Sequence, residues 1–355
     1  MIDVRISPVL IIGTGLVGAS VGCALTRAGL EVHLQDASPT HALVAASRGA
    51  GTIDPIDPED VNLVVVAAPP RVLAPLIEDA LATYPNASVT DTGSIKGVVL
   101  AQLRAGGVDL SRYCGSHPMA GSQRVGPLTA RADLFEERTW IVTPHDNSSA
   151  KAVLAVQRIA DLCGARVISM AAGHHDEAVA QVSHVPQLMS ALVGGGLLEL
   201  PVEHLRLAGQ GLRDVTRIAG SDPGMWTQII SANASAVRTE LEELSEDLQQ
   251  LISVLDDPAQ VTAFLDRGRR GTRRLPGKHG ALPADYAQVV VEIPDEPGAL
   301  ARLFSDIDKA GVNVEDVAID HELEREVGRL TVLVDPGRAP SLRTAMQAAG
   351  WTVRD

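Results

Sequence analysis

Val9-Leu-Ile-Ile-Gly13-Thr-Gly15-Leu-Val-Gly18 is the stretch that decides the fold of the first part of this chain. Its four aliphatic residues predict a buried strand, and the glycines that follow open a helical pattern over residues 16–28. In this context Gly13 permits a tight turn, Gly15 lets the backbone approach a pyrophosphate, and Gly18 allows close packing of helix on strand. The stretch therefore predicts a dinucleotide-binding site at the start of that helix.

The residues around this glycine loop favour NAD as the dinucleotide. Leu16 and Val17 begin the helix, where unpaired backbone N–H groups can meet the phosphates. The next predicted strand ends at Asp36, whose carboxylate would accept hydrogen bonds from the ribose hydroxyls and repel the 2′-phosphate of NADP. An ordinary turn residue is the alternative interpretation of Asp36. Ala68 and Asp91 follow later strands and are further expected cofactor contacts.

The first 170 residues alternate short aliphatic runs with helical patterns, which is typical of a Rossmann-type, doubly wound α/β domain. The Val and Ile content of these runs predicts a parallel sheet that is buried on both faces. The expected strands are residues 9–12, 31–35, 62–67, 88–90, 139–143 and 165–169. We place this domain at residues 1–170.

Helical spacing replaces the strand pattern over residues 171–266, which predicts an all-helical second domain. An apolar stripe recurs there at steps of four and three residues, at Val237, Leu241, Leu244, Leu248, Leu251 and Leu255. Such a stripe fits a helix that faces a core or one that faces a second subunit. Both interpretations stay open at this point.

A third, small domain is predicted after a basic segment. Residues 267–286 begin with a run rich in glycine and arginine, which we interpret as a solvated linker rather than a phosphate site. The following pattern predicts strands at 288–293, 312–320, 328–334 and 351–354 and helices at 298–310 and 339–348. This βαββαβ order predicts a ferredoxin-like domain over residues 287–355.

Composition excludes several classes of function. The chain has 355 residues and a formal net charge of −14, which disfavours nucleic acid and anionic membranes as partners. Three scattered cysteines fit neither a disulfide framework nor a metal cluster. The N-terminal residues lack a signal-peptide pattern, and no apolar run is long enough to cross a bilayer. We therefore expect a cytoplasmic protein without a metal.

Four separated motifs point to one family. Asp91-Thr-Gly-Ser94-Ile-Lys96-Gly and Gly115-Ser-His117-Pro-Met-Ala-Gly121-Ser122-Gln123 fall where strands should end, at the edge where such sheets bind ligands. Ser183-His184-Val-Pro186 and Asp214-Val-Thr-Arg217-Ile-Ala-Gly-Ser-Asp222-Pro-Gly-Met-Trp226 follow in the helical region. Together they resemble the prephenate/arogenate dehydrogenases of tyrosine biosynthesis, and the resemblance covers roughly residues 8–265.

This resemblance implies the oxidative decarboxylation of prephenate to 4-hydroxyphenylpyruvate, with hydride transfer to NAD. The ring hydroxyl must lose a proton, and His117 is the expected general base, with Ser94 hydrogen-bonded to the same oxygen. Arg217 is expected to hold a substrate carboxylate with its bidentate guanidinium. Arg213, four residues earlier, is interpreted as part of a structural ion pair. The resemblance places Ser183, His184, Ser122, Gln123 and Trp226 in the substrate pocket, with a core position as the alternative for Trp226.

The choice of substrate is left more open than the reaction. Gln123 and Gln187 are neutral where relatives often carry an acidic residue and a histidine, respectively, and this tilts the prediction toward prephenate. An arogenate or dual-specificity cyclohexadienyl dehydrogenase is the alternative enzyme. A non-catalytic amino-acid sensor is the alternative from another class. The helical domain is expected to form a homodimer.

The C-terminal domain resembles an ACT domain, a module that often binds amino acids. Asp295-Glu-Pro-Gly298-Ala-Leu300 lies between a predicted strand and helix, and Asn313 enters the next strand. Gly298 would free backbone N–H groups for a ligand carboxylate, and Asn313 could bond the same ligand. Tyrosine is the expected effector, and a module that only dimerises is the alternative.

Overall fold

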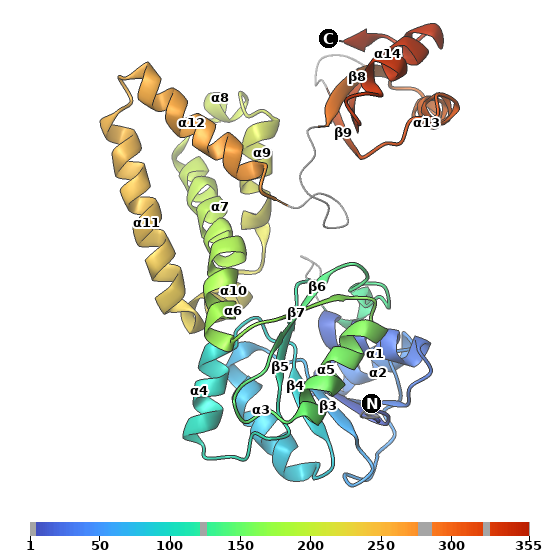
Figure 1. The fold of residues 1–355 in the computed structure, drawn as a ribbon, viewed down its shortest axis with the longest axis vertical. Helices are drawn as coiled ribbons and strands as arrows, with labels where there is room; N and C mark the ends of the chain where they lie inside the picture. The colour runs from blue at the N-terminus through green and yellow to red at the C-terminus, as the bar shows by residue number, and fades with distance from the viewer. Residues whose placement is uncertain (1–4, 121–125, 276–285, 322–326, 355) are drawn as a thin grey trace. The chain divides into compact units, whose positions relative to one another are not determined.

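The computed structural model describes residues 5–120, 126–275, 286–321 and 327–354 (Figure 1). The chain divides into two compact units, residues 1–250 and 251–355. Among the described helices, none combines the length and apolar character that a bilayer crossing requires.

The first unit begins with an α/β part and continues into a helical part (Figure 1). The strands of the α/β part are β1 (Val9–Ile12), β2 (Val32–Gln35), β3 (Leu63–Val66), β4 (Ser88–Asp91), β5 (Gly115–Pro118), β6 (Thr139–Thr143) and β7 (Arg166–Ser169). Its helices are α1 (Leu16–Arg27), α2 (Pro39–Ser47), α3 (Pro70–Thr83), α4 (Gly97–Ala105) and α5 (Ala150–Leu162). The helical part holds α6 (Ala172–Val179), α7 (Val185–Gly196), α8 (Val202–Leu205), α9 (Gln210–Thr216), α10 (Pro223–Ala232) and α11 (Ala234–Ser253).

The strands form two sheets rather than the single parallel sheet expected. Strands β2, β1, β3 and β4 lie in that order and are all parallel. The other sheet has the order β5-β6-β7, with β5 antiparallel to β6. The sequence pattern missed β5 because its residues, Gly-Ser-His-Pro, carry no β-branched or aliphatic side chain. The six strands that were predicted all form, with ends that differ by at most one residue.

Apolar clusters on opposite faces of the parallel sheet confirm the doubly wound architecture. Ile11 and Val65 belong to a cluster that includes residues of α1 and α5. Val64 and Val66, which alternate with Val65 along β3, belong to a second cluster with α3 and α4. Every residue of β3 is buried, as expected for a central strand covered on both faces. The carboxyl ends of these strands are thereby held rigidly at one edge of the sheet.

Helices α6 and α7 are joined by a π-helical turn, Ala180–His184. Pro186 lies in the first turn of α7 and has no N–H to donate to the carbonyl four residues earlier, so the regular ladder is interrupted there. Of the predicted apolar stripe, Val237 is buried on α11, whereas Leu248 and Leu255 are 54% and 60% exposed. The stripe is therefore only partly buried within this chain.

The second unit contains α12 (Pro258–Thr272) and the predicted βαββαβ order. Its elements are β8 (Ala287–Pro294), α13 (Ala299–Lys309), β9 (Asp316–His321), β10 (Val327–Val334), α14 (Ala339–Ala348) and β11 (Val353–Arg354). They form one antiparallel sheet of order β11-β8-β10-β9. The linker expected from residue 267 is corrected at its start, because α12 continues to Thr272. Aspartate capping by Asp257 and the run of helix-compatible residues explain this helix.

Candidate functional site

The glycine loop after β1 has the geometry of a phosphate cradle. Gly13 has φ +97, and a Cβ there would lie 2.3 Å from the Ala67 carbonyl oxygen. A Cβ on Gly18 would lie 1.9 Å from the Gly13 oxygen, whereas the Cβ position of Gly15 faces open space. Gly15 is also the N-cap of α1, and because it has no side chain it cannot cap the N–H groups of the first helical turn. The loop thus needs glycine for packing at two positions and leaves room for a pyrophosphate at the third.

Asp36, at the end of β2, is fixed as a carboxylate beside this loop. Its Oδ2 accepts hydrogen bonds from the Thr14 N–H at 2.6 Å and the Thr14 hydroxyl at 2.9 Å. Its Oδ1 accepts one from the Ser38 N–H at 2.8 Å. Partial burial acts to raise the pKa of Asp36, but these hydrogen bonds outweigh it and the pKa is lowered. A charged carboxylate at this place fits a ribose diol and opposes a 2′-phosphate.

We expect Asp36→Ala to reduce the preference for NAD over NADP by tenfold or more, because it removes a negative charge from the ribose position. The measurement is the ratio of kcat/KM for NAD to that for NADP. Asp54→Ala, which removes the same charge from an exposed carboxylate, is the matched control. A ratio that is identical before and after Asp36→Ala would remove Asp36 from the cofactor site.

The loop after β4 is held by a buried ion pair. Lys96 and Asp91 are 1% and 0% exposed, and the Lys96 Nζ bonds the Asp91 Oδ1 and the Ser116 carbonyl, the latter at 2.8 Å. The Tyr113 hydroxyl donates to the Asp91 Oδ2 at 2.8 Å, and burial followed by the Asp91 charge raises the Tyr113 pKa well above its usual value. Asp91 was expected to contact the cofactor, and the structure shows both of its carboxylate oxygens bonded to Lys96 and Tyr113 inside the protein. The pair instead ties the loop that carries Ser94 to β5.

His117 lies on β5, half-buried, with its Nδ1 2.9 Å from the Nε2 of His175. Its pKa is lowered well below the usual value, first by burial and then by the neighbouring His175, Lys96 and His184. His117 is therefore uncharged at neutral pH. An uncharged imidazole is the state that can accept a proton from a substrate hydroxyl.

His175 and Asp176 were missed as site residues by sequence reasoning. Both are buried on α6, and the His175 Nδ1 lies 2.8 Å from the Asp176 Oδ1. A signal was available: these polar residues share the buried face of α6 with Ala172 and Val179 at helical spacing. Among the residues that the structure describes, no group of three or more His, Cys, Asp or Glu side chains could hold a metal ion.

His184 lies in the π-helical turn and is also uncharged. Its Nδ1 lies 3.1 Å from the Asn233 Nδ2, which also donates to the Asp176 carbonyl at 2.8 Å. Burial lowers the His184 pKa to about 4. Since Asn233 donates to Nδ1, the proton of the neutral ring is on Nε2, and His184 has a donor to offer. The Trp226 ring meets it edge-on, with centroids 6.1 Å apart.

The other predicted substrate residues differ in how far they are exposed. Ser94 and Ser183 are half-buried, and Arg217 is exposed at the start of the 3-10 turn Arg217–Gly220. This turn is fixed on α7, because Gln187 Nε2 donates to the Ile218 carbonyl at 3.0 Å. Ser122 and Gln123 lie outside the described residues. The ion pair expected for Arg213 does not occur among the residues that the structure describes.

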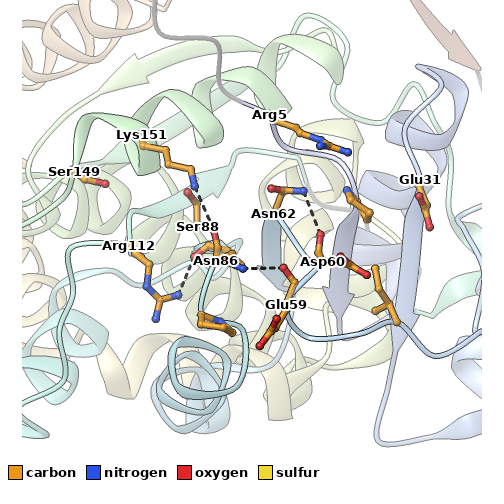
Figure 2. A pocket seen from close by; sticks show the side chains of 14 residues that line it. Arg5, Glu31, Glu59, Asp60, Asn62, Asn86, Ser88, Arg112, Ser149 and Lys151 are labelled. Carbon is orange, nitrogen blue, oxygen red and sulfur yellow. Dashed lines mark hydrogen bonds between the residues drawn. The ribbon is translucent and has the colours of Figure 1, made fainter.

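A hollow of about 740 Å³ lies at the opposite edge of the parallel sheet and is not this site (Figure 2). Pro8, Asn62 and Ser88, which line it, are at the amino ends of β1, β3 and β4. Arg112 points into the same region, but its guanidinium donates to the Ala87 carbonyl at 2.9 Å and the Tyr84 carbonyl at 2.8 Å and so caps the end of α3. The ligand edge of such sheets is the carboxyl edge, where Gly13 and Asp36 lie.

Comparisons with known proteins agree with this geometry. The profile of the prephenate dehydrogenase nucleotide-binding domain matches residues 21–169, and that of the prephenate dehydrogenase dimerization domain matches residues 171–264. NovF of Streptomyces niveus, a probable prephenate dehydrogenase, is 35% identical over 96% of this chain and 98% of its own. The chain belongs to the prephenate dehydrogenase family.

Other members of the prephenate dehydrogenase family extend the comparison. The prephenate dehydrogenase of Bacillus subtilis strain 168 is 26% identical over 88% of this chain and 87% of its own. The crystal structure of prephenate dehydrogenase from A. aeolicus, in complex with hydroxyphenyl propionate and NAD+, is 26% identical and has a TM-score of 0.69. It covers 76% of this chain and 98% of its own. These findings confirm the resemblance read from the four motifs, and with it the expectation of NAD.

Proposed function

We propose that this chain catalyses the NAD-dependent oxidative decarboxylation of prephenate to 4-hydroxyphenylpyruvate. The observation that carries the proposal is the uncharged His117, held by a buried polar network on the strand that carries the family motif. The test is a steady-state assay of the purified protein with prephenate and with arogenate, each with NAD and NADP. Turnover of prephenate with NAD is expected to be the fastest of the four.

The chain's own residues can serve each proton movement of this reaction. Oxidation of the ring carbon removes a hydride from carbon and a proton from its hydroxyl, and His117 Nε2 takes the proton. NAD, when bound, supplies the hydride acceptor. The new carbonyl accepts the electron pair released as the bond to the ring carboxylate breaks and CO₂ leaves. The phenolate that results recovers the proton from the His117 imidazolium, so the ring ends as a neutral phenol.

Arg217 is proposed to hold a carboxylate of prephenate. It is exposed, and its turn is anchored on α7 through Ile218 and through Ser190, whose hydroxyl accepts the Ala219 N–H at 3.1 Å. A guanidinium on a fixed turn offers two parallel donors to a carboxylate.

Arg217→Ala is expected to raise the KM for prephenate tenfold to a hundredfold, since a hydrogen bond to a charged group contributes about 1.5–3 kcal/mol. The KM for NAD should stay near its original value. Arg213→Ala, one helical turn earlier on α9 and also exposed, is the control. An unaltered KM for prephenate in Arg217→Ala would move the anchor elsewhere.

Arogenate is the alternative substrate. A cyclohexadienyl dehydrogenase, that of Zymomonas mobilis, is 30% identical over 68% of this chain and 86% of its own. Arogenate carries an ammonium in place of the keto oxygen, and its binding favours a nearby carboxylate. Gln123, where relatives often carry an acidic residue, is neutral, as is the buried Gln187. Prephenate is therefore the preferred substrate of this proposal.

We also propose that the helical part forms a homodimer. Its α7–α9 region exposes a series of large apolar side chains, among them Leu192 at 67%, Leu198 at 86% and Leu207 at 82%. Exposed apolar surface of this extent is typical of protein interfaces. The matched family profile describes a dimerization domain over the same residues.

The βαββαβ unit is proposed to be a ferredoxin-like ACT module that binds tyrosine. Gly298, with φ +86, precedes α13 and gives access to the helix start. Asn313 precedes β9, and its Nδ2 donates a hydrogen bond to the Glu315 Oε1 at 2.7 Å. Addition of tyrosine to the assay tests the effector role, and a module that only dimerises is the alternative. An inhibitor must bind one state of the enzyme more tightly than another.

A further inference from the structure

We infer that His175 and Asp176 form a positioning relay that fixes the tautomer of His117 and thereby makes its Nε2 the basic nitrogen. The inference rests on the proposed function, because it deepens the assignment of His117 as the base. It concerns two residues that act through His117 and not on the substrate.

The far end of the relay is an anchored carboxylate. The Asp176 Oδ1 accepts the backbone N–H of Lys96 at 2.9 Å, and its Oδ2 accepts that of Gly97 at 2.7 Å. These are N–H groups at the start of α4, where the helix dipole favours an anion. Gly97 is needed for this approach, since a Cβ there would lie 2.7 Å from the Asp176 Oδ2. With both oxygens facing backbone N–H donors, the Asp176 carboxylate acts as a hydrogen-bond acceptor.

The proton positions follow from this acceptor. Because Asp176 accepts, the Nδ1 of His175 carries a proton, which leaves its Nε2 as the nitrogen that can accept from His117. His117 then donates its Nδ1–H to that nitrogen across 2.9 Å. The remaining nitrogen of His117, Nε2, is left without a proton. The network thus selects the one neutral tautomer of His117 that can remove a proton through Nε2.

The relay also stabilises the charge that catalysis creates. When the half-buried His117 gains a proton it becomes an imidazolium, which its burial and the charge of Lys96 oppose. The groups that face it are His175 and Asp176 on α6, His184 in the π-helical turn, and the Lys96–Asp91 pair beside β5. Of these groups, Asp176 is the carboxylate that hydrogen bonds link to His117, because His175 bonds both residues.

The decisive variant is Asp176→Asn, which keeps the size and removes the charge. The new amide can adopt two orientations. Its NH₂ group faces the Gly97 N–H in the first and the His175 Nδ1 in the second. The second orientation places a proton on His175 Nε2 and turns His117 into the tautomer with a protonated Nε2. We expect kcat to fall tenfold to a hundredfold, with the KM for prephenate and the dissociation constant of NAD changed less than twofold. The acid limb of the kcat/KM profile should move to lower pH, because the imidazolium has lost a nearby negative charge.

Two further variants separate the relay from general damage. Gly97→Ala changes no ionisable group but displaces the Asp176 carboxylate, so it should lower kcat as Asp176→Asn does. His174→Gln, on the exposed side of the same helix, should leave kcat and the pH profile unchanged. Nitrogen-15 NMR of labelled histidine gives a readout besides activity: an Nδ1-protonated His117 is expected at neutral pH, and its loss in Asp176→Asn.

The outcomes divide cleanly. An Asp176→Asn enzyme with the original kcat, or with a lowered kcat and an unmoved acid limb, overturns the relay. His117→Asn in the same series distinguishes this from failure of the proposed function: if that variant keeps its kcat, the base assignment itself is wrong. If His117→Asn is inactive while Asp176→Asn is unaffected, only the relay is rejected.

Discussion

Replacing His117 with asparagine is expected to lower kcat for prephenate by roughly 10²- to 10⁴-fold, the usual contribution of a general base. Asparagine is the informative substitution because its amide can still donate to the His175 Nε2, as the His117 Nδ1 does across 2.9 Å. The polar network is then preserved while the proton acceptor is lost. The measurement is kcat at saturating prephenate and NAD.

The pH dependence of the original enzyme adds a second readout. His117 has a pKa well below its usual value, and it is active as the neutral ring. Activity is lost where the ring takes up a proton, so kcat/KM should stay level as the pH falls through 6.5, the value at which an unperturbed histidine titrates, and decline only below it.

NAD binding provides the control for His117→Asn. The dissociation constant of NADH, followed by its fluorescence, should match that of the original protein, because Gly13 and Asp36 follow β1 and β2 whereas His117 lies on β5. Unchanged kcat in a folded His117→Asn protein would exclude the base assignment and favour the non-catalytic amino-acid sensor as the alternative.

The sequence predicted those parts of the structure that depend on local pattern. The strand Val9–Ile12 and the start of α1 at Leu16 follow from aliphatic periodicity and from a glycine spacing that few other structures require. Asp36 could be singled out because its distance along the chain from the glycines is set by one βαβ unit. Backbone geometry at these positions leaves little choice of residue.

The parts that were missed depend on contacts between distant segments. Asp91 has the sequence context of a cofactor residue, and only the packing of Lys96 and Tyr113 around it shows that its carboxylate is buried. His175 is separated from His117 by 58 positions, and no periodicity links them. Long-range polar pairs of this kind follow from how α6 packs against β5, which a single sequence does not specify.

Replacement of Lys96 by methionine is expected to lower the free energy of unfolding by about 3–5 kcal/mol, because it leaves the buried Asp91 carboxylate without its counter-charge. Methionine fills much of the space of the lysine stem, so the loss reports the charge more than a cavity. Chemical denaturation of the two proteins measures the difference. The variant should also lose activity, since the Lys96 Nζ no longer donates to the Ser116 carbonyl next to His117.

A double variant distinguishes the ion pair from general disruption. Adding Asp91→Asn to Lys96→Met removes the uncompensated charge while an amide remains to meet the Tyr113 hydroxyl, so the double variant should be more stable than Lys96→Met alone. Arg131→Met, which breaks a surface ion pair with Asp133, is the control and should unfold close to the original midpoint. If the double variant is less stable than Lys96→Met by the full effect of Asp91→Asn, the two charges act independently. In that case the loop that carries Ser94 is held to β5 by packing and not by the buried pair.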